Sequence, residues 1–256
     1  ASNNTAVGYA TLLANTTGHG NVAVGKDSMA ANTEGFQNVA LGEDSLQANT
    51  TGDYNVALGK SALFANTTAD YNIAIGRNTL AANTTGASNT AVGGLALTAN
   101  TTGTLNTASG LSALQANTTG ANNSALGVNT LATNSTGSDN VAIGYQSLLS
   151  NTTASNNTAV GNASLKVNTT GGSNTAVGYG TLDANTTGQL NTAVGYNALT
   201  AQNADAYNTA VGANSMESTT SGSSNAALGR LSLNANTTGS NNTGIGYSAL
   251  QANTTG

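Results

Sequence analysis

The chain repeats a unit of 17 residues without an insertion or a deletion. An asparagine recurs at this interval from Asn4 to Asn242, so the 256 residues hold fifteen copies of the unit. The first full copy spans 4–20, and the last, 242–256, is incomplete. Because so short a unit contacts only its neighbours, the period predicts a single continuous repeat array over 1–256 and not a globular core. We expect this array to be a segment of a longer fibre.

Two short strands and two turns are predicted in each unit. Numbered from the recurrent Asn, the unit reads N-(T/V)-A-(V/L/I)-G-x-x-(A/S/T)-L-x-A-N-T-T-G-x-x. Positions 2 to 4, as in Val22–Val24, and positions 7 to 11, as in Ser61–Ala65, favour strands. Glycine at position 5 and usually at position 15 would cost a helix about 1 kcal/mol each. Position 5 suits a corner that needs positive φ or close backbone approach. The first five corner glycines are Gly8, Gly25, Gly42, Gly59 and Gly76.

These features predict an all-β fold, a β-solenoid or parallel β-roll of fifteen 17-residue coils. Residue n then lies next to residue n+17 at a strand spacing of about 4.8 Å, and like side chains form ladders along the stack. We expect the apolar side chains at positions 4 and 9 to form the core. The predicted core ladder comprises Val7, Leu12, Val24, Leu41, Leu46, Leu58, Leu63, Ile75, Leu80, Ile143 and Leu148.

Alanine at position 3 predicts contact with a second chain. Side chains alternate along a strand, so position 3 faces away from positions 2 and 4. A small apolar residue on that side indicates that the strand is covered on both faces. We therefore expect a parallel homo-oligomer, with three chains preferred and two also compatible with this reasoning. The predicted interchain face includes Ala23, Ala40, Ala57, Ala74 and Ala91.

Composition excludes several classes of function. The net charge is −5, with only five Lys and Arg residues, which argues against nucleic-acid binding. Cysteine is absent, so thiol chemistry and disulfides are excluded. No apolar run is long enough to insert into a membrane. The chain begins at Ala1 without a signal-like region, so we expect a soluble segment, and any signal or anchor would lie outside it.

Candidate catalytic and metal-binding residues are few. His19 is the only histidine and lacks the partners that a ligand or general base needs, so we interpret it as a solvated turn residue. Asp53 and Asp70 share one position in adjacent coils, as do Asp27 and Asp44. Such pairs could bind Ca²⁺, but a mildly repulsive exposed ladder is the preferred interpretation. We expect a non-enzymatic protein with no catalytic residue, no cofactor and no metal.

Charged residues and tyrosines that recur at positions 6 and 17 predict ladders of side chains on the surface. Position 6 reads Lys26, Glu43, Lys60 and Arg77 in four successive coils, which suggests an ion-pair ladder of little energy per pair. Tyrosines recur at positions 6 and 17, and exposed Tyr offers a large contact area at low entropy cost. Ordinary stacking between coils is the preferred interpretation of these tyrosines. The candidate adhesive residues are Tyr54, Tyr71, Tyr179 and Tyr196.

The Asn-Thr-Thr arm allows two further interpretations. Asn15, Asn49, Asn83 and Asn185 begin N-x-T glycosylation sequons, although a ladder of stacked asparagine amides explains them more simply. Regularly spaced threonines are also the design of ice-binding solenoids, and an extended arm would place Asn117 and Thr119 on one side. The arm reads as a turn, so ice binding is the less favoured alternative.

The stretch Asn38-Val39-Ala40-Leu41-Gly42, with its equivalents from Asn72 and Asn140, resembles the head repeat of YadA-like trimeric autotransporter adhesins. The resemblance covers every copy, although the family's usual unit is shorter. The resemblance implies a left-handed parallel β-roll that assembles as a homotrimer on the bacterial surface and binds host matrix or other surfaces; the receptor is not identified. The repeats are also similar to parts of trimeric phage tail fibres.

We therefore expect a structural or adhesive head or shaft segment of an extracellular trimeric fibre. The alternatives are a tail-fibre segment, which would be part of a virion, and a self-assembling extracellular filament.

Overall fold

Each coil of the protein holds one short strand. The computed structural model describes residues 1–256 and contains no helix. Every strand covers positions 2 to 4 of the repeat. The strands are β1 (Thr5–Val7), β2 (Val22–Val24), β3 (Val39–Leu41), β4 (Val56–Leu58), β5 (Ile73–Ile75), β6 (Thr90–Val92), β7 (Thr107–Ser109), β8 (Ser124–Leu126), β9 (Val141–Ile143), β10 (Thr158–Val160), β11 (Thr175–Val177), β12 (Thr192–Val194), β13 (Thr209–Val211), β14 (Ala226–Leu228) and β15 (Thr243–Ile245).

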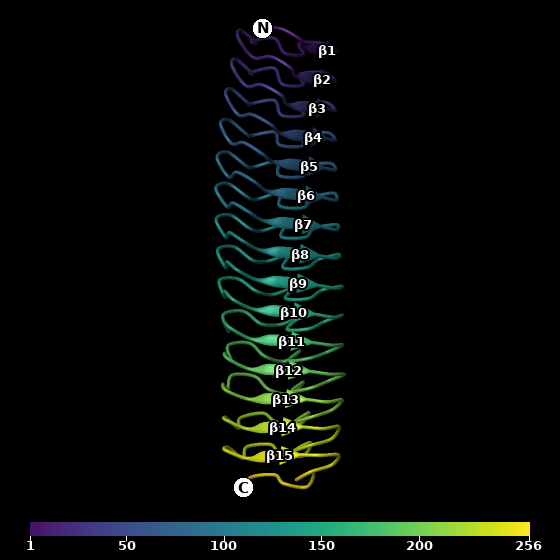
Figure 1. Ribbon diagram of the computed structural model, residues 1–256, viewed down its shortest axis with the longest axis vertical. Coiled ribbons are helices and arrows are strands. Elements are labelled where there is room, and N and C mark those ends of the chain that lie inside the picture. Colours follow the sequence, from purple (N-terminus) through teal and green to yellow (C-terminus); the bar gives the residue numbers. More distant parts are fainter. The chain divides into compact units, whose positions relative to one another are not determined.

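The chain forms two compact units, Ala1–Val128 with β1 to β8 and Asn129–Gly256 with β9 to β15. Within each unit, successive strands pair in parallel and in register (Figure 1). Val22 pairs with Val39, and Thr158 pairs with Thr175, a separation of 17 residues in both cases. Each unit is therefore a parallel β-solenoid with a 17-residue coil, which confirms the predicted fold class and period.

The second predicted strand is wrong. The segment Ser61–Ala65 is a series of turns, because Ser61 and Leu63 adopt left-handed φ values of 56° and 51°. Its backbone still bonds to the coils on both sides. The Ser61 N–H donates to the Glu43 carbonyl at 2.9 Å, and the Leu63 N–H donates to the Thr79 carbonyl at 3.0 Å. Left-handed φ at a leucine costs about 1–2 kcal/mol, which these hydrogen bonds and burial of the side chain offset.

Leucine at position 9 and alanine at position 3 form the core. Leu46, Leu63, Leu80 and Leu148 are fully buried, whereas Leu12, in the first coil, is half-buried. Methionine at this position, as in Met29, is also fully buried.

The predicted orientation of the strand is wrong. Position 4 points outward, so the members of the predicted core ladder at this position do not lie in the core. Val7, Leu41, Ile75 and Ile143 are exposed, and Val24 and Leu58 are half-buried. Position 3 points inward, so the predicted interchain face is instead the interior of a single chain. Each of its five residues, Ala23, Ala40, Ala57, Ala74 and Ala91, is 0% exposed.

The narrowness of the coil explains this orientation. The Ser147 hydroxyl at position 8 donates to the carbonyl of Ala159 at position 3 of the next coil, at 2.9 Å. The two walls of the coil therefore lie within hydrogen-bonding distance. A Cβ added at Gly244, the one glycine at position 3, would lie 2.7 Å from Oγ of Ser232 and 3.2 Å from Cγ of Leu233. With leucine already inside, the coil has room for a methyl group at position 3 but not for valine.

Asparagine amides form two ladders inside the coil. At position 1, the Asn38 N–H donates to Oδ1 of Asn21 at 2.9 Å, and Nδ2 of Asn38 donates to the Gly52 carbonyl at 2.8 Å. At position 12, Nδ2 of Asn49 donates to Oδ1 of Asn32 at 2.8 Å. Buried polar groups need such partners to be tolerated. The recurrent asparagines are therefore structural.

The corner glycines adopt the positive φ values that the sequence suggested. The φ values of Gly8, Gly25, Gly42, Gly59 and Gly76 are 142°, 136°, 140°, 136° and 135°. A Cβ at Gly25 would lie 2.4 Å from the Gly42 carbonyl oxygen, closer than atoms can approach. Both the conformation and the close stacking of the corners therefore require glycine.

Candidate binding face

The outer face of each sheet is built from positions 2 and 4 of the strands. In β5, Ile73 and Ile75 are 38% and 39% exposed on this face, while Ala74 between them is buried. No charged residue occupies position 2 or 4 in any strand, and every Lys, Arg, Asp and Glu lies elsewhere in the repeat. We call these outward side chains the strand face. It is an uncharged surface with one row of side chains per coil.

Four neighbouring strands of the first unit carry only aliphatic residues on the strand face. Their register aligns equivalent side chains in two rows. The exposed fraction reaches 49% at Leu41. Contiguous exposed apolar surface on a soluble protein commonly marks an interaction site. We define the aliphatic patch as Val22, Val24, Val39, Leu41, Val56, Leu58, Ile73 and Ile75.

Four neighbouring strands of the second unit carry threonine and valine instead. Threonine occupies position 2 and valine position 4 in each of β10 to β13, again in register. The threonine side chains lie on the outer side of the strands, and their hydroxyls make no hydrogen bond within the protein. We define the threonine array as Thr158, Thr175, Thr192 and Thr209 with Val160, Val177, Val194 and Val211.

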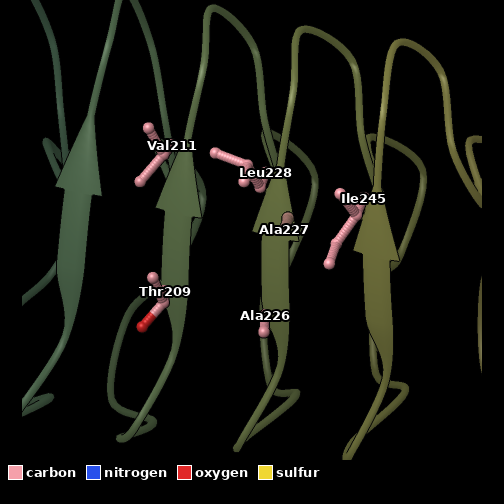
Figure 2. Close-up of a pocket in the computed structure, with 6 residues that line it drawn as sticks. All are labelled: Thr209, Val211, Ala226, Ala227, Leu228 and Ile245. Carbon is pink, nitrogen blue, oxygen red and sulfur yellow. The ribbon is translucent and has the colours of Figure 1, made fainter.

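A shallow hollow ends the threonine array. Position 2 of β14 is Ala226, which is smaller than the threonines on both sides. The hollow has a volume of about 320 Å³. Figure 2 shows the side chains of Val211, Leu228 and Ile245, which line the hollow, projecting from three neighbouring strands. The regular Thr-x-Val surface therefore does not extend beyond β13. The lining residues are Thr209, Val211, Ala226, Ala227, Leu228 and Ile245.

Aromatic side chains stack along the exposed corner of the first unit. The rings of Tyr54 and Tyr71 are parallel with centroids 5.0 Å apart, and Phe36 meets Tyr54 edge-on at 5.2 Å. In the second unit, the rings of Tyr179 and Tyr196 stack at 5.4 Å. All four tyrosines are exposed. Because stacked rings cover each other's faces, they present mainly edges to a ligand. An adhesive role for these tyrosines stays a prediction.

The structure places His19 and the paired acidic residues in contacts between coils. The imidazole ring of His19 stacks on Phe36 with centroids 5.0 Å apart. Oδ1 of Asp53 accepts the Phe36 N–H at 2.8 Å, and Oδ1 of Asp70 accepts the Asp53 N–H at 2.7 Å. Burial raises the pKa of Asp53, and the nearby charge of Asp70 raises it further, against the lowering effect of the Phe36 hydrogen bond. Both carboxylates are thus bound to backbone amides. No group of three or more His, Cys, Asp or Glu residues could hold a metal ion.

The predicted charge ladder forms one close pair between coils. Nζ of Lys60 lies 2.7 Å from Oε2 of Glu43, and this hydrogen bond lowers the pKa of Glu43 and raises the pKa of Lys60. Nζ of Lys26 instead lies 3.4 Å from Asp27 in its own coil. Asp27 thus pairs with Lys26, and Oδ1 of Asp44 accepts a hydrogen bond from Nε2 of Gln47 at 3.2 Å. Neither carboxylate bonds to a backbone amide as Asp53 and Asp70 do.

The arm asparagines are not available to a ligand or a glycan. Asn49, Asn83 and Asn185 are fully buried, and Asn15 is half-buried with its amide bonded to the Gly18 carbonyl. Nδ2 of Asn117 donates to Oδ1 of Asn100 at 2.8 Å. The preferred amide ladder is therefore present. The ice-binding side suggested for Asn117 and Thr119 is wrong, because Asn117 points into the coil.

Comparison of the chain with known families, with curated proteins and with solved structures finds no match. None of the chain's elements is a helix that could cross a membrane. The strand face is the regular uncharged surface from which we argue a function. The sequence reasoning missed it because it assigned position 4 to the interior.

Proposed function

We propose that the chain is a structural segment of an extracellular fibre in which identical chains pack together through the aliphatic patch. The single observation that carries this proposal is the outward orientation of eight aliphatic side chains on β2 to β5. The strand face contains no charged residue that would oppose their burial. Removing such side chains from water contributes about 25 cal/mol per Å². Water-exposed aliphatic residues on four consecutive strands favour burial against a partner.

A second copy of the chain fits this surface by its spacing. The patch consists of rows that repeat at the strand separation of about 4.8 Å. A sister chain carries rows with the same repeat, so ridges of one chain can pack between ridges of the other along the whole patch. An unrelated globular partner would lack this matching period. A trimer is the expected stoichiometry, because the Asn-Val-Ala-Leu-Gly repeat resembles that of trimeric adhesins.

The proposed setting is the head or shaft of a bacterial surface adhesin. It rests on the same resemblance and on the exposed tyrosines at the corners and edges of the coils, which offer contact area outside the strand face. The proposal assigns the chain no catalytic role. The polar side chains inside the coil bond to neighbouring coils, as a structural role requires.

Sedimentation equilibrium on the full chain tests the assembly. We expect a mass of three chains for the natural protein and of one chain for the double variant Leu41→Lys, Leu58→Lys, because lysine places charge in the proposed interface. The control is Thr51→Lys with Thr68→Lys, which adds the same charge to exposed arm positions of the same coils and should leave the trimer intact. A natural protein that sediments as a monomer at high concentration would falsify the proposal.

A further inference from the structure

The threonine array differs chemically from the aliphatic patch, although both occupy the strand face. Four consecutive coils carry Thr158, Thr175, Thr192 and Thr209 at position 2, where β2 to β5 carry valine or isoleucine. A hydroxyl covered by an apolar partner and left without a hydrogen bond costs about 1–3 kcal/mol. These hydroxyls have no partner inside the protein. Four of them in succession therefore favour a hydrogen-bonding neighbour, such as ordered water.

The hydroxyls and methyl groups of the array form a regular grid. Pairing in register separates neighbouring threonines by about 4.8 Å, and residues two apart on one strand by about 6.6 Å. Along one lattice direction, the oxygens of hexagonal ice repeat at an interval similar to the spacing of neighbouring threonines. The grid is also stiff, because threonine and valine are branched at Cβ and have restricted χ1 angles. Backbone hydrogen bonds between coils hold the strands in place, as when the Thr175 N–H donates to the Asn191 carbonyl at 2.8 Å.

The array lacks charges that would impose a different order on water. No Lys, Arg, Asp or Glu occupies the outward positions of β10 to β13. The array therefore suits the uncharged ice lattice as a binding partner better than it suits a charged ligand. The alternation of hydroxyl and apolar groups lets water bond to each threonine while the valines support a cage-like arrangement beside it.

We propose that the threonine array of β10 to β13 is an ice-binding surface. Water molecules held on its grid take positions compatible with the ice lattice, and the protein then adsorbs to growing ice. This activity goes beyond the proposed assembly function, since it uses the second unit and does not require the aliphatic patch. Ice is the occupant favoured by this row of regularly spaced hydroxyls beside an uncharged row of valines.

The test measures thermal hysteresis and the shape of ice crystals in solutions of the full chain. We expect the natural protein to shape ice and to depress the freezing point below the melting point. The double variant Thr175→Lys, Thr192→Lys should lose both effects, because two long charged side chains prevent close contact with the lattice. The control is Thr170→Lys with Thr187→Lys, which adds the same charge at exposed arm threonines of the two coils that begin at Asn157 and Asn174 in the same unit. This control should retain both effects, and circular dichroism should show that all three proteins are folded.

Two results would overturn the ice-binding surface. One is a natural protein that neither shapes ice nor shows hysteresis. The other is equal loss of activity in the array variant and the arm control. Sedimentation of the same variants separates this proposal from the assembly proposal. A lower mass for Thr175→Lys, Thr192→Lys together with no ice activity in the natural protein would place the array between chains, leaving the fibre proposal intact.

Discussion

Gln202 interrupts the amide ladder at Asn185. At position 12 of the next coil, an asparagine would donate to Oδ1 of Asn185, but Nε2 of Gln202 donates instead to the Asp205 carbonyl. Oδ1 of Asn185 is buried and has no hydrogen-bond partner, and the same holds for the hydroxyl of Thr219, which takes position 12 one coil further. Two successive substitutions in the ladder thus leave two buried groups unsatisfied. The hydrogen bonding of the interior is therefore incomplete at these two coils.

Gln202→Asn should stabilise the protein by about 1 kcal/mol, because the shorter amide can donate to Asn185 and accept from the Thr219 hydroxyl. Native-state hydrogen exchange is the suitable measurement, since long repeat arrays can unfold coil by coil. Protection should rise in the coils around Asn185. Gln47→Asn, at a half-buried position outside the ladder and in the other unit, is the control and should leave the protection around Asn185 unchanged. Unchanged protection at Asn185 would show that the ladder tolerates the gap without cost.

Two adjacent glycines should respond differently to alanine. Gly93 has a φ of 128°, and a Cβ there would lie 2.6 Å from the Gly110 carbonyl oxygen. Gly93→Ala should therefore destabilise the protein by more than about 2 kcal/mol. A Cβ at Gly94 meets only Cδ1 of Leu111 at 3.7 Å, so Gly94→Ala should stay within about 0.5 kcal/mol of the natural protein. Thermal denaturation of both variants measures the contrast, and equal effects would contradict the corner geometry.

Enlarging the inward side of a strand should be far more damaging than enlarging its outward side. Ala91 is fully buried inside the coil, whereas Val92 is 38% exposed on the strand face. Ala91→Leu should destabilise the protein by about 3 kcal/mol or prevent folding, because the interior has no space for the added carbons. Val92→Leu should be nearly neutral. Denaturant unfolding compares them, and a tolerated Ala91→Leu would refute the narrow interior.

Asp183 makes stability depend on pH in a defined direction. Burial raises the pKa of this carboxyl, with a smaller opposing effect of Lys166, and its buried Oδ1 has no hydrogen-bond partner. The folded protein therefore holds the proton more strongly than the unfolded chain. The contribution of Asp183 to stability falls as pH rises from its unfolded pKa of about 3.9 through its higher folded value.

Asp183→Asn should consequently raise the melting temperature at pH 7 and give little or no gain at pH 3, where the natural carboxyl is protonated. Melting curves of the natural and variant proteins across this range provide the measurement. Asp139→Asn, at an exposed corner, is the control. A gain from Asp183→Asn that is the same at pH 3 and pH 7 would mean that the carboxyl's charge is not its cause.

The candidate binding face was only partly predictable from the sequence. The uncharged composition of positions 2 and 4 is visible in the repeat, and so is the change from Val22 and Val39 in the first unit to Thr175 and Thr192 in the second. Threonine at position 2 was a signal that this side of the strand faces outward. The large aliphatic residues at position 4 instead predicted that this side of the strand faces inward, because such side chains are usually buried.

The exact period alone settles the coil length, the pairing of residue n with n+17, and the ladders of asparagine and glycine, because an uninterrupted repeat allows every coil the same neighbours. The tertiary structure decides which side of the strand is inside. Ser147 reaches the Ala159 carbonyl across the coil, and Leu148 already fills the space beside them, so only a methyl group fits at position 3. The tertiary structure also decides that the segment around the leucine at position 9 turns through left-handed φ values. Leucine disfavours this conformation unless burial of its side chain in a packed interior compensates for the cost. The width of the interior is a property of the closed coil, and for that reason no local pattern of residues reveals it.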